Sequence, residues 1–240
     1  MRNLLYRFIK RLFDILSSAL AITVSSPLWL IIAIGIKASS KGSVFYRADR
    51  VGKGAKKFTL YKFRSMHLYA SEDKGQGEQR EGGAIANVAR VFPFGAFLRK
   101  SKLDELPQLL NILMGQMSVV GPRPTSELGA KNHFIGKYDN VLTVRPGLAG
   151  LDSLYDYAHG ELVVQDSDEY YNKIAPVRDR LASMHVEKQS VWLDIYCILR
   201  TLKLMFQITV QKKREFPLTK YEAEAEKSVF GVATMECEVE

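Results

Sequence analysis

The sequence is poor in the residues that build disulfides and transition-metal sites. It has two cysteines in 240 residues, Cys197 and Cys237, with no CxxC or other ligand spacing. This fits a reducing cytosol and argues against a disulfide framework. Four histidines stand singly, without the short spacings of a zinc site: His67, His133, His159 and His185. A transition-metal site is therefore not expected.

Common nucleotide and nucleic-acid motifs are also missing. Neither GxxxxGKS/T nor GxGxxG occurs, so neither a P-loop nor a Rossmann site is indicated. No helix-turn-helix, RRM or zinc pattern points to nucleic acid. The net charge of +8 predicts anionic partners, which are nucleic acid, acidic lipid headgroups or phosphorylated small molecules, and does not choose among them. A diphosphate would have to be held by arginines and a carboxylate-bound Mg²⁺.

One long apolar run lies near the start of the chain. Residues 15–36 form 22 positions without a charged side chain, and a helix of that length, at ~1.5 Å per residue, crosses a bilayer core of roughly 30 Å. Ser25, Ser26 and Pro27 lie near its middle, where the proline predicts a kink and the serines can bond freed backbone groups. A signal peptide is disfavoured because its apolar region is about 7–15 residues long. A buried core helix is disfavoured by the length.

Basic residues flank this run on both sides. They are Arg2, Arg7, Lys10 and Arg11 before it, and Lys37, Lys41, Arg47, Arg50, Lys53, Lys56 and Lys57 after it. A straight span would export one of these clusters against the positive-inside tendency. We therefore expect a re-entrant helix that bends at Ser26-Pro27 and leaves the membrane on the side it entered, with a straight span as the alternative.

The rest of the chain predicts short strands and several helices. Strands are expected at Val44–Tyr46 and Phe58–Phe63, and a polar loop at Ser71–Gly83. Helices are expected at Leu103–Leu113 with Pro107 in the first turn, at Ser126–Tyr138, at Asp168–Leu181, and as an amphipathic segment within Val186–Ile208. Beyond Gln211 the chain predicts poor order.

Asp104 and Glu105 begin the helix expected from Leu103, where carboxylates often only complement the helix dipole. Their neighbours suggest a larger role, because Arg99 precedes them and Arg123 stands between two prolines. A carboxylate near cations and helix N–H groups should stay ionised, as a nucleophile requires. The restricted backbone could present Arg123 to a phosphate, although a rigid surface turn explains the same tetrapeptide equally well.

Three further cations are candidates for phosphate contacts. Lys62 and Arg64 are two positions apart and share one face if the strand continues, and Arg145 precedes Pro146-Gly147. Each of the three, taken alone, is more often a solvated surface charge.

Several segments recur together in one known family. They are Lys10–Pro27 with its Ser26-Pro27 break, Lys62–Met66 (KFRSM), Leu98–Leu109 (LRKSKLDELPQL), Met117–Pro124 (MSVVGPRP), Arg145–Gly150 (RPGLAG) and Ser190–Ile195 (SVWLDI). In these segments, over about residues 10–207, the chain resembles the monotopic polyprenyl-phosphate phosphoglycosyltransferases of the bacterial sugar transferase family.

The resemblance implies a reaction and its site. Asp104 would attack the sugar-bearing phosphate of a UDP-sugar, release UMP and pass the phospho-sugar to a polyprenyl phosphate such as undecaprenyl phosphate. Glu105 would bind Mg²⁺. Phosphate contacts would come from Arg99, Arg123, Arg145, Lys62 and Arg64. The product would begin a membrane glycoconjugate or exopolysaccharide.

The resemblance also implies an architecture and a location. The expected fold is α+β and predominantly helical, with a re-entrant membrane helix (1–40), a catalytic domain with a small β-hairpin and amphipathic interfacial helices (41–210), and a poorly ordered tail (211–240). The enzyme would lie in the bacterial inner membrane with its active site on the cytoplasmic face, in contact with the lipid bilayer. No nucleic-acid partner is expected, and a homo-oligomer is left open.

The chain departs from the family at two places where glutamine is common. Ala48 and Ser153 stand there instead, so the sugar cannot be carried over from the resemblance. Two alternative functions remain. Asp104 could act as a base in a direct ternary transfer, or the chain could be a non-enzymatic, membrane-tethered protein that binds acidic lipid or nucleic acid through its basic surface.

Overall fold

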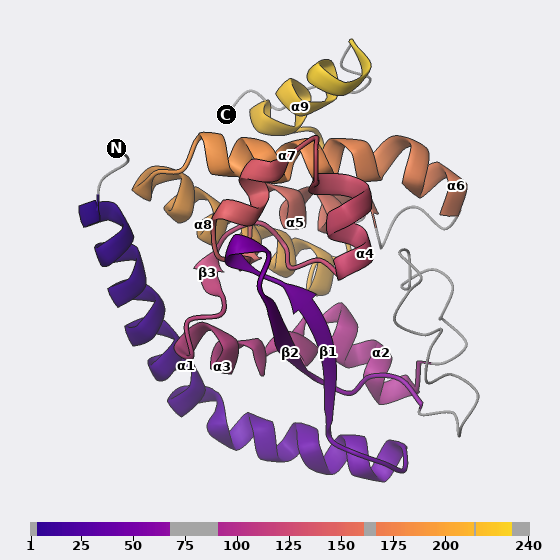
Figure 1. The fold of residues 1–240 in the computed structure, drawn as a ribbon. Helices are drawn as coiled ribbons and strands as arrows, with labels where there is room; N and C mark the ends of the chain where they lie inside the picture. Colours follow the sequence, from indigo (N-terminus) through magenta and orange to yellow (C-terminus); the bar gives the residue numbers. More distant parts are fainter. Residues whose placement is uncertain (1–3, 68–90, 161–166, 214, 232–240) are drawn as a thin grey trace.

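A computed structural model describes residues 4–67, 91–160, 167–213 and 215–231, which form a mostly helical structure with two small sheets (Figure 1). This agrees with the expected helical α+β class. The loop expected at Ser71–Gly83 lies outside the described residues.

Helix α1 runs from Leu4 to Ser39 and carries Pro27 in its interior. Figure 1 shows it bent, so that its two parts lie along different sides of the molecule. Proline has no N–H to donate to the carbonyl four residues back, which belongs to Thr23. The Ser26 hydroxyl donates to that carbonyl at 2.8 Å. The expected bend is present, and the serine satisfies the acceptor that the proline leaves free.

Most of α1 is uncovered by the rest of the protein. Its most apolar window of 18 residues has a mean hydropathy of 2.1 and is 11% buried, so its length and composition suit a membrane crossing. Its buried residues are Asp14, Ser18, Ile32 and Ile36. A core helix of a soluble protein would be mostly buried, and this exposure argues against that alternative.

The first sheet is an antiparallel hairpin of β1 (Phe45–Val51) and β2 (Lys57–Phe63), joined through the 3₁₀ turn η1 (Lys53–Ala55). Strand β1 extends beyond the expected Val44–Tyr46. Residues 47–50 include three charged side chains, which concealed the strand in the sequence, but the backbone pairs with β2 through to Val51.

The second sheet joins two of the motif segments. Strand β3 (Ser118–Val120) and strand β4 (Gly147–Ala149) are parallel, with Ser118 paired to Gly147 and Val120 to Ala149. The short sheet therefore brings the chain before Pro122 next to the chain after Pro146.

The remaining elements are short helices and three longer ones. In chain order they are α2 (Pro93–Lys100), η3 (Leu103–Glu105), α3 (Gln108–Leu113), α4 (Glu127–Gly129), η4 (Ala130–Phe134), η5 (Asp139–Thr143), α5 (Leu151–Tyr155), η6 (Asp156–Gly160), α6 (Ser167–Glu169), η7 (Tyr170–Ile174), α7 (Ala175–Glu187), α8 (Val191–Thr209) and α9 (Lys220–Phe230). The single helix expected over Leu103–Leu113 is divided, because η3 ends at Glu105 and α3 begins anew with Pro107 as its N-cap residue.

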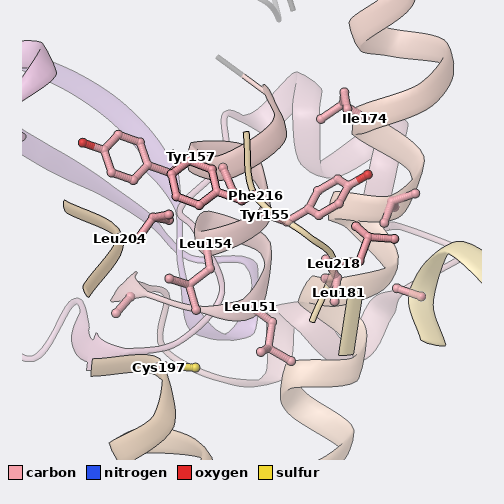
Figure 2. Packing of buried hydrophobic residues seen from close by; sticks show 14 of the residues in the cluster. Leu151, Leu154, Tyr155, Tyr157, Ile174, Leu181, Cys197, Leu204, Phe216 and Leu218 are labelled. Atoms are coloured by element: carbon pink, nitrogen blue, oxygen red, sulfur yellow. The ribbon is translucent and has the colours of Figure 1, made fainter. Parts of the chain in front are cut away.

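The largest apolar cluster lies between α5, η6, α7 and α8. Figure 2 shows Leu151, Leu154 and Tyr155 packed with Leu181 and Leu204. Phe216 and Leu218, which follow α8 in the chain, close the same cluster. A smaller cluster packs Ile32 and Ile36 of α1 against Phe63, Phe92 and Leu98.

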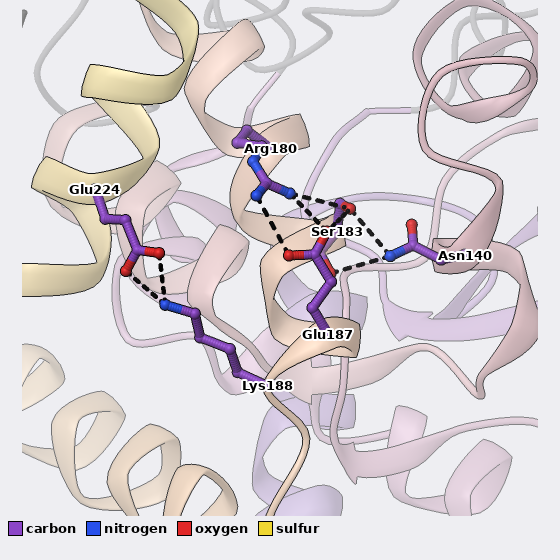
Figure 3. Close-up of polar contacts among 6 residues, drawn as sticks. All are labelled: Asn140, Arg180, Ser183, Glu187, Lys188 and Glu224. Atoms are coloured by element: carbon purple, nitrogen blue, oxygen red, sulfur yellow. Dashed lines mark hydrogen bonds and ion pairs between the residues drawn. The ribbon is translucent and has the colours of Figure 1, made fainter. Parts of the chain in front are cut away.

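The prediction of poor order beyond Gln211 is wrong for residues 220–230, which form α9. A capping box begins this helix: the Thr219 hydroxyl accepts from the Glu222 N–H, and the Glu222 carboxylate accepts from the Thr219 N–H. Figure 3 shows Glu224 of α9 paired with Lys188 at the end of α7. The same view shows Asn140 donating to Ser183 of α7, at 3.0 Å to the hydroxyl.

Candidate active site

Asp104 lies in the turn η3, which follows a residue with a left-handed backbone, Lys102 at φ 55°. The Asp104 side chain is buried, and its Oδ1 has no hydrogen-bond partner among the described residues. Burial raises the pKa of Asp104 above its ordinary value, although the charges of Lys62 and Lys102 act in the opposite direction. Desolvation therefore outweighs the nearby cations in setting the direction of this pKa shift, and the expectation that Asp104 is ionised stays a prediction.

Glu105, the next residue, has different surroundings. Its Oε1 lies 2.9 Å from the Lys62 ammonium and 3.4 Å from a guanidinium nitrogen of Arg123. Burial raises the pKa of Glu105, but the charges of Lys62 and Arg123 outweigh burial and hold it well below its ordinary value. The structure therefore brings one firmly ionised carboxylate and one with a raised pKa side by side.

Three separate segments supply the groups around this pair. Lys62 projects from β2, whose register with β1 fixes its position. Arg123 comes from the Gly-Pro-Arg-Pro segment that follows β3. Arg99 lies in the last turn of α2, contacts the Met66 sulfur at 3.8 Å, and exerts its charge on Asp104.

The Arg123 backbone is fixed by contacts that sequence reasoning did not find. Its N–H donates to Oδ2 of Asp152 in α5 at 2.7 Å. On either side, the Gly121 N–H donates to the Ala149 carbonyl and the Gly147 N–H to the Pro122 carbonyl, both at 2.8 Å. The available signal for Asp152 was its place directly before Ser153, one of the two positions where the chain departs from the family pattern.

Tyr157 is a second residue that the sequence did not indicate. The Lys102 ammonium lies 4.6 Å from the centre of its ring, and the Tyr157 hydroxyl donates to the Lys100 carbonyl at 3.0 Å. Tyr157 thus holds the segment that carries Lys102 toward Asp104.

The structure does not bring Arg64 to the carboxylate pair. Strand β2 ends at Phe63, so Arg64 no longer shares a face with Lys62. Its side chain is buried and donates to the carbonyls of Ser40, Lys41 and Ser43. Arg64 therefore ties the end of α1 to the hairpin.

Arg145 also lies elsewhere. Its Nε donates to the Gly115 carbonyl at 2.8 Å, just beyond α3. Burial lowers the pKa of Arg145, and the charges that act on it are those of Arg11, Asp14 and Arg7. Arg145 thus belongs to the basic surroundings of α1 rather than to the Asp104 pair.

Residues 5–208 match the family described as bacterial sugar transferase. The chain belongs to the bacterial sugar transferase family.

Relatives within this family include proteins with named activities. The chain is 35% identical over 206 residues to a UDP-N-acetylgalactosamine-undecaprenyl-phosphate N-acetylgalactosaminephosphotransferase of Aeromonas hydrophila, covering 83% of this chain and 44% of the relative. It is 38% identical over 195 residues to a UDP-glucose:undecaprenyl-phosphate glucose-1-phosphate transferase of Klebsiella pneumoniae, covering 80% and 39%. It is 34% identical over 206 residues to the exopolysaccharide production protein ExoY of Rhizobium meliloti, covering 80% and 83%. The chain therefore spans less than half the length of the first two relatives and most of the third.

Proposed function

We propose that this chain transfers a sugar phosphate from a UDP-sugar to undecaprenyl phosphate, with Asp104 as the nucleophile and UMP as the leaving group. The observation that carries the proposal is the buried Oδ1 of Asp104, which has no hydrogen-bond partner in the described part of the chain and lies beside the Lys62–Glu105–Arg123 cluster. The names of two relatives, which give a UDP-sugar donor and an undecaprenyl-phosphate acceptor, support the choice of substrates.

The reaction proceeds in two displacements at phosphorus. A carboxylate oxygen of Asp104 forms a bond to the sugar-bearing phosphorus as the bond from that phosphorus to the UMP oxygen breaks, and UMP departs with the electron pair. An oxygen of undecaprenyl phosphate then attacks the same phosphorus, and the bond to Asp104 breaks. The carboxylate is restored, and the sugar is left on an undecaprenyl diphosphate.

The surrounding residues serve these steps electrostatically. A carboxyl with a raised pKa is more basic and more nucleophilic once it is deprotonated. Arg123 and Lys102 place fixed positive charge where the phosphates carry negative charge, which favours both displacements. Glu105 holds Lys62 and Arg123 in place through its ion pairs.

Mg²⁺ is the cofactor expected from the sequence, and the carboxylates fit it in part. Asp104 and Glu105 offer adjacent oxygen ligands, and Asp104 Oδ1 is free of protein partners among the described residues. The described part of the chain has no group of three or more His, Cys, Asp or Glu side chains that could enclose a metal. A bound Mg²⁺ would therefore take its remaining ligands from water and substrate phosphates, as is usual for this ion, and would neutralise phosphate charge.

An acceptor with a long polyprenyl chain requires a site at a membrane. Two helices supply exposed apolar surface for it, α1 and α8. On α8 the exposed apolar side chains are Val191, Trp192, Ile195, Leu199, Leu202 and Phe206. The bend in α1 and the basic residues on both sides of its apolar run favour a re-entrant helix, with the catalytic residues on the cytoplasmic face of the inner membrane.

Replacing Asp104 by asparagine tests the proposal, since the amide has nearly the same shape and is a poor nucleophile. We expect Asp104→Asn to abolish transfer, with unchanged membrane association. The matched control is Asp49→Asn, the same change at an exposed position within β1, which should retain activity. Full turnover by Asp104→Asn would refute the proposed role.

A direct ternary transfer with Asp104 as a base is the remaining enzymatic alternative. The two routes differ when the donor is supplied alone. The covalent route releases one UMP per active site and adds a phospho-sugar mass to a peptide containing Asp104. Absence of both in protein that completes transfer with undecaprenyl phosphate would establish the direct route. Assays with a panel of UDP-sugars would identify the donor.

A further inference from the structure

The Gly-Pro-Arg-Pro segment has an unusual shortage of backbone donors. Pro122 and Pro124 have no N–H, so Arg123 carries the only backbone amide hydrogen of residues 122–124. This hydrogen is donated to the side chain of Asp152 at 2.7 Å, across 29 positions of sequence. The one backbone hydrogen of these three residues is therefore donated to a carboxylate from a distant part of the sequence.

The local structure is shaped to let Asp152 reach this hydrogen. Asp152 is the second residue of α5 and is 2% exposed. A Cβ at Gly150 would lie 2.5 Å from Asp152 Oδ1 and 2.3 Å from the Gly121 carbonyl oxygen. Since both contacts are closer than atoms allow, the glycine provides the space in which the carboxylate meets the tetrapeptide.

We infer that Asp152 is a positioning residue for the transfer reaction: by accepting the Arg123 N–H, it fixes the direction in which the Arg123 guanidinium extends toward Glu105 and the donor phosphate. The proposed reaction is the context of this role, whereas the hydrogen bond itself can be tested without it.

The surroundings of Asp152 distinguish this role from simple packing. Oδ2 accepts from Arg123, while Oδ1 is buried without a partner among the described residues. A buried carboxylate that is only half satisfied is unfavourable compared with an apolar side chain of similar size. Burial raises the pKa of Asp152 to about 6, against the opposing effect of hydrogen bonds from the backbone N–H groups of Arg123 and Ser153 and of the charge of Arg178 on α7. An apolar side chain at position 152 could not accept the hydrogen bond from the Arg123 N–H, whereas Asp152 does.

Hydrogen exchange at single-residue resolution tests this hydrogen bond directly. In the full-length protein, we expect the Arg123 amide to exchange at least tenfold faster in Asp152→Ala than in wild type, because an amide without an acceptor loses protection. Asp152→Asn keeps an oxygen acceptor and should retain protection. Asp156→Asn is the matched control, because this buried carboxylate lies in the following turn and accepts from the Tyr170 hydroxyl rather than from Arg123.

Enzyme kinetics of the same variants, measured by UMP release at pH 8, test the role of Asp152 in the reaction. Asp152→Ala should lower kcat/KM for the donor by about tenfold or more, mainly through a higher KM, as expected for a misdirected phosphate ligand. Asp152→Asn should stay within about threefold of wild type and should melt at the same or a higher temperature, since it removes a buried charge. We expect the KM of the wild-type protein to change with pH near 6 and this change to be lost in Asp152→Asn.

Three results would overturn the inference. They are unchanged exchange at Arg123 in folded Asp152→Ala, wild-type kcat/KM in that variant, or an Asp152→Asn variant as impaired as Asp152→Ala. If wild-type protein released no UMP at all, the proposed function would fail, and the exchange measurement would still decide whether Asp152 holds Arg123.

Discussion

At the scale of single residues, Asp104 and Glu105 are neighbours whose pKa values move in opposite directions. The folded-state pKa of Glu105 lies below its ordinary value of 4.5, so its ion pairs stabilise the fold above that pH, and this stabilisation is lost as the pH falls. The contribution of Asp104 to stability depends on pH in the opposite direction, because its pKa is raised from 3.8. Its contribution is fully present below pH 3.8 and is lost as the pH rises through the raised value.

Lys62 is the cation whose charge acts most strongly on both carboxyls. Replacement of Lys62 by methionine should raise the pKa of both Asp104 and Glu105. Because UMP release requires ionised Asp104, the acid limb of its pH profile should move to higher pH. At pH 7 we expect a loss of about tenfold or more in kcat/KM, in line with the removal of one charged stabilising group. Lys56→Met, at an exposed lysine before β2, is the control. An unshifted acid limb in Lys62→Met would contradict this assignment.

Some of the residues expected around the carboxylate pair come together in the structure, whereas others lie elsewhere or were missed. Lys62 and Arg123 were expected near Asp104, and both contact Glu105. Asp152 was missed because its contact with Arg123 depends on the packing of α5 against the Gly-Pro-Arg-Pro segment. Arg64 was misplaced because spacing along a strand gives its face only while the strand continues, and β2 ends one residue earlier.

At the scale of elements, α1 and α9 show which features of a sequence are sufficient to predict a helix. The apolar part of α1 and its bend followed from an uncharged run interrupted by Pro27, although the helix itself begins earlier, at Leu4. Helix α9 was missed because its charged composition resembles that of a disordered tail. A Thr-x-x-Glu capping box, Thr219 with Glu222, was nevertheless present in the sequence, and it marks the N-terminus of the helix.

Pro27→Ala tests whether the bend determines the topology of α1. Restoring an N–H at this position allows the backbone bond to the Thr23 carbonyl and should straighten the helix, which would move the N-terminus across the membrane. Labelling of a cysteine introduced at Asn3, from each side in intact cells and inverted vesicles, measures this. Ser26→Ala, which keeps the proline, is the control and should retain the wild-type labelling. Protection identical to wild type in Pro27→Ala would refute the prediction.

At the scale of the whole molecule, α1 and α8 present the apolar surface, and the catalytic pair lies between β2, α2 and the segment after β3. The proposed membrane position follows from this distribution of surface rather than from any single residue. Trp192 at the start of α8 is 80% exposed, which is an unfavourable position for a large aromatic ring in water. The interface of a bilayer is the environment that suits it.

Trp192 fluorescence provides a test of the membrane position. The chain has two tryptophans, and Trp29→Phe leaves Trp192 as the only tryptophan, which can be excited selectively over the tyrosines. In nanodiscs with lipids brominated near the headgroup, we expect strong quenching of Trp192 and a blue-shifted emission compared with urea-unfolded protein. Weak quenching equal to that of free tryptophan in the same nanodiscs would place α8 in water.

The close approach of Gly121 to Gly147 has a consequence for exchanging parts between relatives. A Cβ at Gly147 would lie 2.2 Å from the Gly121 nitrogen, so the two backbones touch with no side chain between them. A chimera that imports only one of the two loops, in an attempt to change donor preference, would pair surfaces shaped in different proteins. Grafts that carry residues 117–124 and 145–152 together preserve the fit, and they are the natural unit for recombination in this scaffold.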